Sequence, residues 1–68
     1  MSLTETVGTE IKSRRLSRRM SQGALAAKAG LSVSYISMLE RGQRSPPLDT
    51  IELLAKALHV KPLELLGA

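Results

Sequence analysis

Apolar residues recur at spacings of three and four along almost the whole chain, which is the pattern of amphipathic helices. No segment alternates apolar and polar residues as a half-buried strand does. The pattern is interrupted at Gly30, Gly42, the Pro46-Pro47 pair and Pro62, which are residue types that end helices or form turns. The sequence therefore predicts an all-α fold with five helices, at about residues 5–19, 21–29, 32–41, 48–58 and 62–66.

The second and third predicted helices are separated by a very short turn. Ser21 and Ser32 belong to the residue types that cap helix N-termini, and Gly30 is the type that ends a helix in the left-handed conformation. A three-residue junction makes two short helices cross at roughly 90–120°. This predicts a helix-turn-helix unit over residues 21–42. The inward-facing anchors of its second helix are expected to be Ile36 and Leu39.

The size and charge of the chain narrow its possible roles. Its 68 residues form one domain at most, expected to span residues 1–68, with a thin core. Residues 12–44 carry eight Lys or Arg and one acid, a local charge of +7, whereas residues 45–68 carry two bases and three acids, a local charge of −1. A basic central section indicates either a polyanion as partner or a solvated arginine-rich face.

The sequence lacks the residue patterns that are typical of several classes of function. There is no cysteine and only one histidine, His59, so no metal site can be recognised, and neither paired catalytic carboxylates nor a phosphate-binding glycine loop is found. The longest run without a charge, residues 29–39, is too short to span a membrane, and no signal-peptide pattern is present. We therefore expect a cytoplasmic protein that is not an enzyme and has no cofactor, metal, membrane partner or small-molecule ligand.

A dense motif occupies the helix-turn-helix region. It reads Ser21-Gln22-x-x-Leu25-Ala26-x-x-Ala29-Gly30-Leu31-Ser32-x-x-Tyr35-Ile36-Ser37-x-Leu39-Glu40-Arg41-Gly42. Flanking it are Val7-Gly8-x-x-Ile11 with Arg15, and Pro47-Leu48-x-x-Ile51-x-x-Leu54-Ala55-x-Ala57-Leu58-x-Val60. These residues resemble the phage-repressor (Xre/Cro-like) helix-turn-helix family from residue 7 to about residue 66. Within it, the Ser-Tyr-Ile-Ser and Glu-Arg-Gly-x-Arg patterns are most similar to those of restriction-modification controller proteins.

This resemblance implies both a fold and a function. The fold is a compact five-helix bundle of the lambda-repressor-like DNA-binding type. The function is that of a transcriptional regulator, such as a repressor, which binds a palindromic operator in double-stranded DNA as a homodimer. The recognition helix, residues 32–41, would lie in the major groove. Antitoxins and coactivator-type proteins use the same bundle as a protein-interaction module, which is the alternative, but the basic central section favours DNA.

The residues expected to read bases lie on the outward side of the recognition helix. These positions hold Val33, Ser34, Ser37 and Met38, and the resemblance places the first two and Met38 at base-reading positions. None of them can make the bidentate contacts that Arg, Asn and Gln make. Val33 and Met38 can pack on a thymine methyl group or remain simply exposed. Arg44, just after the Glu-Arg-Gly turn, is implied by the resemblance to reach a base, and a phosphate contact is the alternative.

A second set of residues is expected to contact the DNA backbone. Gln22 lies in the first turn of the second helix, where backbone N–H groups and the helix dipole favour an anion, and in the family a glutamine there touches phosphate. The hydroxyl of Tyr35 suits phosphate, although the ring can instead be a packed aromatic. The set is completed by Ser32, Arg41 and Gln43.

Two arginines of the first helix differ in their expected roles. The resemblance pairs Arg15 with Glu40 in a structural ion pair between the first helix and the end of the third. Arg14 departs from the family, which often has an apolar residue there, and Leu16 is expected to compensate for it.

The C-terminal segment is richer in apolar residues than one buried face requires. The surplus predicts a homodimer interface, unless all of these residues simply close the core. The residues concerned are Val60, Leu63, Leu65 and Leu66.

Overall fold

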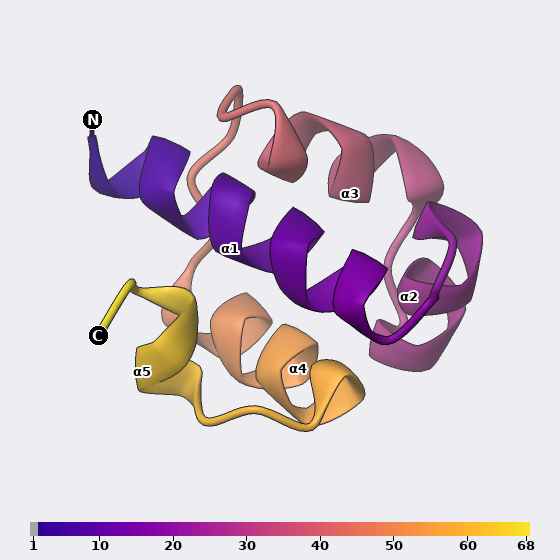
Figure 1. Ribbon diagram of the computed structural model, residues 1–68. Coiled ribbons are helices and arrows are strands. Elements are labelled where there is room, and N and C mark those ends of the chain that lie inside the picture. The colour runs from indigo at the N-terminus through magenta and orange to yellow at the C-terminus, as the bar shows by residue number, and fades with distance from the viewer. Residues whose placement is uncertain (1) are drawn as a thin grey trace.

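The computed structural model describes residues 2–68, and within this range every regular element is a helix (Figure 1). The predicted all-α architecture of five helices is confirmed. In chain order they are α1 (Leu3–Ser17), α2 (Gln22–Ala29), α3 (Val33–Glu40), α4 (Leu48–Leu58) and α5 (Pro62–Leu65). None of these helices is long and apolar enough to cross a membrane.

Helix α1 begins and ends two residues earlier than the apolar pattern predicts. Its start is fixed by a capping box, in which Glu5 N–H donates to Ser2 Oγ (3.2 Å) and Ser2 N–H donates to Glu5 Oε1 (3.0 Å). The hydrogen bond from the Ser2 backbone N–H, and after it the hydrogen bond from the Ser2 side chain, lower the pKa of the Glu5 carboxyl. The helix ends at Ser17 because Arg19 adopts a left-handed conformation with φ +56°.

The turn between α2 and α3 has the predicted caps. Ser21 Oγ accepts a hydrogen bond from Ala24 N–H (3.0 Å), and Ser32 Oγ accepts one from Tyr35 N–H (3.1 Å). Gly30 has φ +72° and ends α2 in the left-handed conformation. Local capping chemistry therefore sets both ends of the helix-turn-helix junction.

One continuous core lies between the five helices. Helix α4 has the predicted bounds, and α5 ends one residue earlier than predicted. Helix α1 packs against α3, α4 and α5, and α4 packs against α2 and α5 (Figure 1). The apolar core residues are Val7, Ile11, Leu25, Ala26, Ala29, Ile36, Leu39, Ile51, Leu54, Ala55, Ala57, Leu58 and Leu65.

The environment of Arg14 corrects one expectation. Leu16 is 55% exposed, so it does not compensate for Arg14 in the packing of α1. The Arg14 guanidinium instead pairs with Glu10 (Nε–Oε1 3.3 Å) and with Glu64 of α5 (Nη1–Oε2 3.1 Å). The ion pair with Glu64 thus connects α1 to α5.

Helices α1 and α3 are in close contact at Gly8, which is buried in α1. A Cβ atom on this residue would overlap the carbonyl oxygen of Leu39 and lie 3.2 Å from that of Glu40. The absence of a side chain here therefore sets how close α3 can lie to α1. This contact holds the recognition helix against the rest of the bundle.

Candidate nucleic-acid interface

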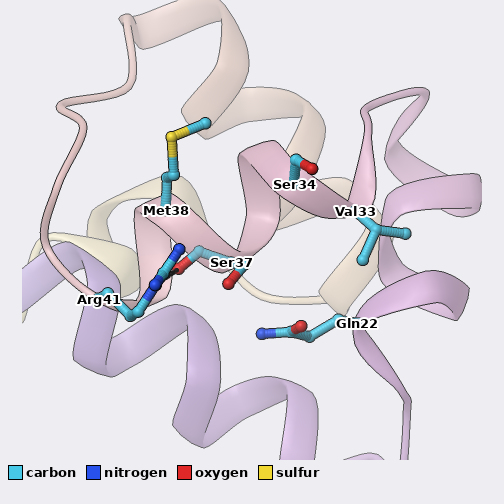
Figure 2. A pocket seen from close by; sticks show the side chains of 6 residues that line it. All are labelled: Gln22, Val33, Ser34, Ser37, Met38 and Arg41. Carbon is cyan, nitrogen blue, oxygen red and sulfur yellow. Dashed lines mark hydrogen bonds between the residues drawn. The ribbon is translucent and has the colours of Figure 1, made fainter.

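An open hollow of about 470 Å³ lies on the outer side of α3, next to the start of α2 (Figure 2). It brings together all four base-reading candidates on α3 and two of the expected phosphate contacts. The residues that line it are Gln22, Val33, Ser34, Ser37, Met38 and Arg41. We call this surface the recognition hollow.

The periodicity of α3 explains why these side chains face outward. Ile36 and Leu39 are buried and fix the inner side of the helix. With 3.6 residues per turn, Val33, Ser34, Ser37 and Met38 are then directed away from the core. Ser34 is exposed and Val33 is 49% exposed, whereas Ser37 and Met38 are half-buried. The hollow is thus a mixed surface of hydroxyl and apolar groups with one cation, Arg41.

Beside the hollow, a buried ion pair fixes the end of α3 to α1. Arg15 Nε donates to Glu40 Oε2 (2.7 Å) and its Nη2 donates to Glu40 Oε1 (3.0 Å), while its Nη1 donates to the carbonyl oxygen of Met20 (2.8 Å). The hydrogen bond to Glu40 raises the pKa of Arg15, although desolvation opposes this rise. The side chains of Arg15 and Glu40 are only 9% and 3% exposed. The pair therefore neutralises a carboxylate that lies next to the recognition hollow.

Gln22 belongs to this network as well as to the hollow. Its Nε2 donates to Glu40 Oε1 (3.1 Å), a contact that the sequence alone did not suggest. An amide nitrogen carries two hydrogens, so one N–H remains for a phosphate while the other orients the side chain. Figure 2 shows the Gln22 amide and the Arg41 guanidinium at the edge of the hollow. Arg41 Nε donates to the Ser37 carbonyl oxygen (3.3 Å), which folds its side chain back along α3.

The other predicted contacts lie outside the hollow. Ser32 is exposed and its Oγ accepts the capping hydrogen bond, while Tyr35 is half-buried and packs against the core. Gln43 and Arg44 are exposed in the loop between α3 and α4. The structure therefore brings some of the predicted DNA contacts into one surface and leaves Ser32, Tyr35, Gln43 and Arg44 outside it. In the described range, no cluster of three or more His, Asp or Glu residues could hold a metal ion.

Comparison with known proteins agrees with this geometry. The sequence pattern of the helix-turn-helix family matches residues 11–65. The chain belongs to the helix-turn-helix family. This match covers α2, α3 and α4 and thus includes the whole recognition hollow.

Relatives of this helix-turn-helix chain include both classes suggested by its motif. It is 47% identical over 60 residues to the control protein C.BamHI of Bacillus amyloliquefaciens, covering 87% of this chain and 74% of that protein. It is 42% identical over 62 residues to the immunity repressor of Bacillus phage phi105, covering 91% of this chain but only 43% of the repressor. The resemblance to phage repressors and controller proteins is therefore confirmed, and the chain spans less than half the length of the phage repressor.

A solved structure shows the same fold bound to DNA. The restriction-modification controller protein C.Esp1396I, crystallised as a tetramer with its natural 35 base-pair operator, superposes with a TM-score of 0.88 at 34% identity. The superposition covers 98% of this chain and 88% of that one.

A second surface of the helix-turn-helix chain is apolar and corrects the expected interface. Leu65 is fully buried in the core, so it offers no surface to a second subunit, whereas Leu63 is 62% exposed. Val60 and Leu66 are half-buried. Leu48, which the sequence did not place in the interface, is 75% exposed. An open hollow of about 660 Å³, here called the α4–α5 face, is lined by Leu48, Ile51, Glu52, Lys61, Pro62, Leu63 and Leu66.

Proposed function

We propose that this chain is a transcriptional regulator that binds specific sequences in duplex DNA, with α3 in the major groove. The observation that carries the proposal is the recognition hollow, where the outward residues of α3 meet Gln22 and Arg41 on one open surface. The basic section over residues 12–44 supplies the positive potential that a phosphate backbone requires. The operator complex of the related C.Esp1396I supports the same role here.

Each group in and around the hollow has a chemistry suited to one part of a duplex. The methyl groups of Val33 and Met38 can pack on thymine methyls, and the hydroxyls of Ser34 and Ser37 can bond to base edges. Arg44 has the guanidinium that can bind a guanine edge in bidentate fashion. Contacts to the phosphate backbone are assigned to Gln22, Ser32, Tyr35, Arg41 and Gln43.

The proposal is tested by selection from a pool of random duplexes. We expect enrichment of one palindromic sequence, whose affinity falls steeply as the salt concentration rises because phosphate contacts release counterions. If no sequence is enriched and DNA binding stays weak at low salt, the chain is not a DNA-reading regulator. A role as a protein-interaction module, of the antitoxin or coactivator type, would then be the better hypothesis.

Arg44 is predicted to contribute more to base discrimination than Ser34, because none of the base-reading candidates on α3 (Val33, Ser34, Ser37 and Met38) can make a bidentate base contact. Arg44→Ala should weaken binding to the selected sequence by about 5- to 150-fold, the range expected for one bidentate contact. Ser34→Ala should cost less than about fivefold. Binding is measured by fluorescence anisotropy on the selected duplex and on variants of it.

The matched control for Arg44 is Arg44→Lys, which keeps the positive charge and removes the planar fork. We expect it to lose most of the affinity that Arg44→Ala loses. Binding by Arg44→Lys equal to that of the unmodified chain would assign Arg44 to a phosphate and contradict base reading.

The α4–α5 face supports a homodimer. Exposed leucines side by side are costly in water and are typical of an interface, and a chain of this size gains stability from a partner subunit. A two-fold dimer would place two copies of α3 in half-sites about 34 Å apart, one turn of DNA. The palindromic operator follows from this symmetry.

Leu63→Glu is expected to disrupt the homodimer, because it places a carboxylate within the apolar α4–α5 face. The variant should sediment as a monomer at concentrations where the unmodified chain is a dimer, and its affinity for the palindrome should fall at least tenfold. Leu16→Glu is the control, since Leu16 is similarly exposed (55% against 62%) but lies on α1 and does not line this face. A dimer that survives Leu63→Glu, or that Leu16→Glu disrupts equally, would contradict this interface.

A DNA-binding regulator must be in the same compartment as its operator. We therefore expect this protein to be cytoplasmic. The proposed activity is binding alone and involves no catalysis, cofactor or small-molecule ligand.

A further inference from the structure

A third surface, distinct from the recognition hollow and the α4–α5 face, lies between the C-terminal ends of α2 and α4. It is an open hollow of about 380 Å³ lined by Lys28, Leu53, Lys56, Ala57 and His59. We call it the α2–α4 hollow. It shares no residue with either of the other two surfaces. Gln22 and Lys28 lie near opposite ends of α2, so a partner here would leave the recognition hollow free for DNA.

The chemistry of this hollow combines an apolar centre with basic groups. Ala57 is buried, whereas Leu53 is 46% exposed in the middle turns of α4. Lys28 and Lys56 are exposed, and neither takes part in an ion pair within the part of the chain that the structure describes. No acidic residue lines the hollow. The two lysines therefore favour an anionic partner. The apolar centre of the hollow can pack against an aliphatic side chain of that partner.

The remaining residue that lines the hollow is His59. His59 ends α4 in the left-handed conformation, with φ +56° and ψ +43°. Glycine adopts this conformation without strain, whereas a residue with a side chain does not. A left-handed residue commonly ends a helix, and Arg19 follows α1 with the same φ, so this conformation ends α4 and leaves the imidazole of His59 lining the α2–α4 hollow.

We propose that the α2–α4 hollow docks an acidic segment of a partner protein, with one aliphatic side chain of that segment packed on Leu53. Carboxylates of the partner bind Lys28 and Lys56, and the apolar contact gives the interaction its selectivity. A nucleic-acid backbone would satisfy the two lysines but would leave Leu53 in water, so the observations favour a protein. The regulator could then contact its operator and a protein partner at the same time.

The probe is a pair of labelled 12-residue helical peptides rich in glutamate, one with leucines at four-residue spacing and one with alanines in their place. We expect the leucine peptide to bind the full chain at least tenfold more tightly than the alanine peptide, with amide shifts centred on Lys28, Leu53 and Lys56. Lys28→Glu and Leu53→Ser should each weaken its binding at least fivefold. Lys12→Glu makes the same charge change on α1, outside the hollow, and should weaken binding less than twofold.

Folding of Lys28→Glu and Leu53→Ser is checked by circular dichroism and by their melting temperatures, which should stay close to that of the unmodified chain because both side chains are exposed. The proposal is overturned if the two peptides bind equally, if Lys28→Glu has no more effect than Lys12→Glu, or if the shifts centre on α3. It is likewise overturned if a 12-base-pair duplex displaces the peptide from this hollow, because the hollow would then be part of the DNA contact. None of these outcomes depends on whether the chain dimerises or selects a palindrome.

Discussion

Arg15→Met is expected to destabilise the domain by about 3–5 kcal/mol, because it leaves the buried Glu40 carboxylate without its counter-charge. A domain of this length has a total stability of only roughly 3–10 kcal/mol, so the variant should be largely unfolded or should melt at least about 12 °C lower. Thermal and urea denaturation followed by circular dichroism measure this loss.

Two further variants separate the ion pair from a general effect of losing an arginine. Arg14→Met removes the neighbouring arginine, whose ion pairs are partly exposed, and should cost less than about 1 kcal/mol. The double variant Arg15→Met/Glu40→Met removes both buried charges and should recover most of the lost stability. Equal losses for Arg14→Met and Arg15→Met would show that the Arg15–Glu40 pair does not hold α1 to α3.

The second large effect is expected for Gly8→Ala. The added methyl group overlaps the carbonyl oxygen of Leu39, so α1 and α3 must move apart, and the free energy of unfolding should fall by about 1–3 kcal/mol. This loss should occur even though alanine is the better helix former. The displaced α3 should also bind the selected DNA more weakly, which anisotropy measures alongside the denaturation curves.

Gly23→Ala is the matched control, since it is the same substitution in another helix. A Cβ at Gly23 would meet only Ser21 Oγ at 3.8 Å and Val33 Cγ2 at 4.0 Å, both ordinary contacts. This variant should gain about 0.4–1 kcal/mol because alanine restricts the unfolded chain. If both variants stabilise the protein, the close approach of α1 and α3 at Gly8 does not exist.

The features that the sequence predicted correctly depend on short-range chemistry. Ser21, Gly30 and Ser32 act within a few residues of themselves, and their roles in the turn could be read directly. Ile36 and Leu39 followed from helical periodicity, and with them the outward positions of α3. The core of the site could therefore be predicted before the structure was known.

The features that the sequence did not predict depend on which helices pack against each other in the fold. Gly8 stands in a helical segment where glycine is unfavourable, and this was the available signal for a close contact, but only the fold shows that the contact is with Leu39. Leu65 was expected in an interface because the C-terminal segment holds more apolar residues than one buried face requires, and so short a helix does not show in sequence which of them face inward. The hydrogen bond from Gln22 to Glu40 joins residues 18 positions apart and carries no local pattern.

The assignment of the recognition hollow to DNA is tested most directly by mapping amide chemical shifts of the ¹⁵N-labelled chain during titration with the selected duplex. We predict that the largest shifts fall at the start of α2 and from Ser32 to Arg44, around the recognition hollow. Shifts concentrated in α4 and α5, with α3 unchanged, would contradict the claim that this helix-turn-helix surface reads DNA.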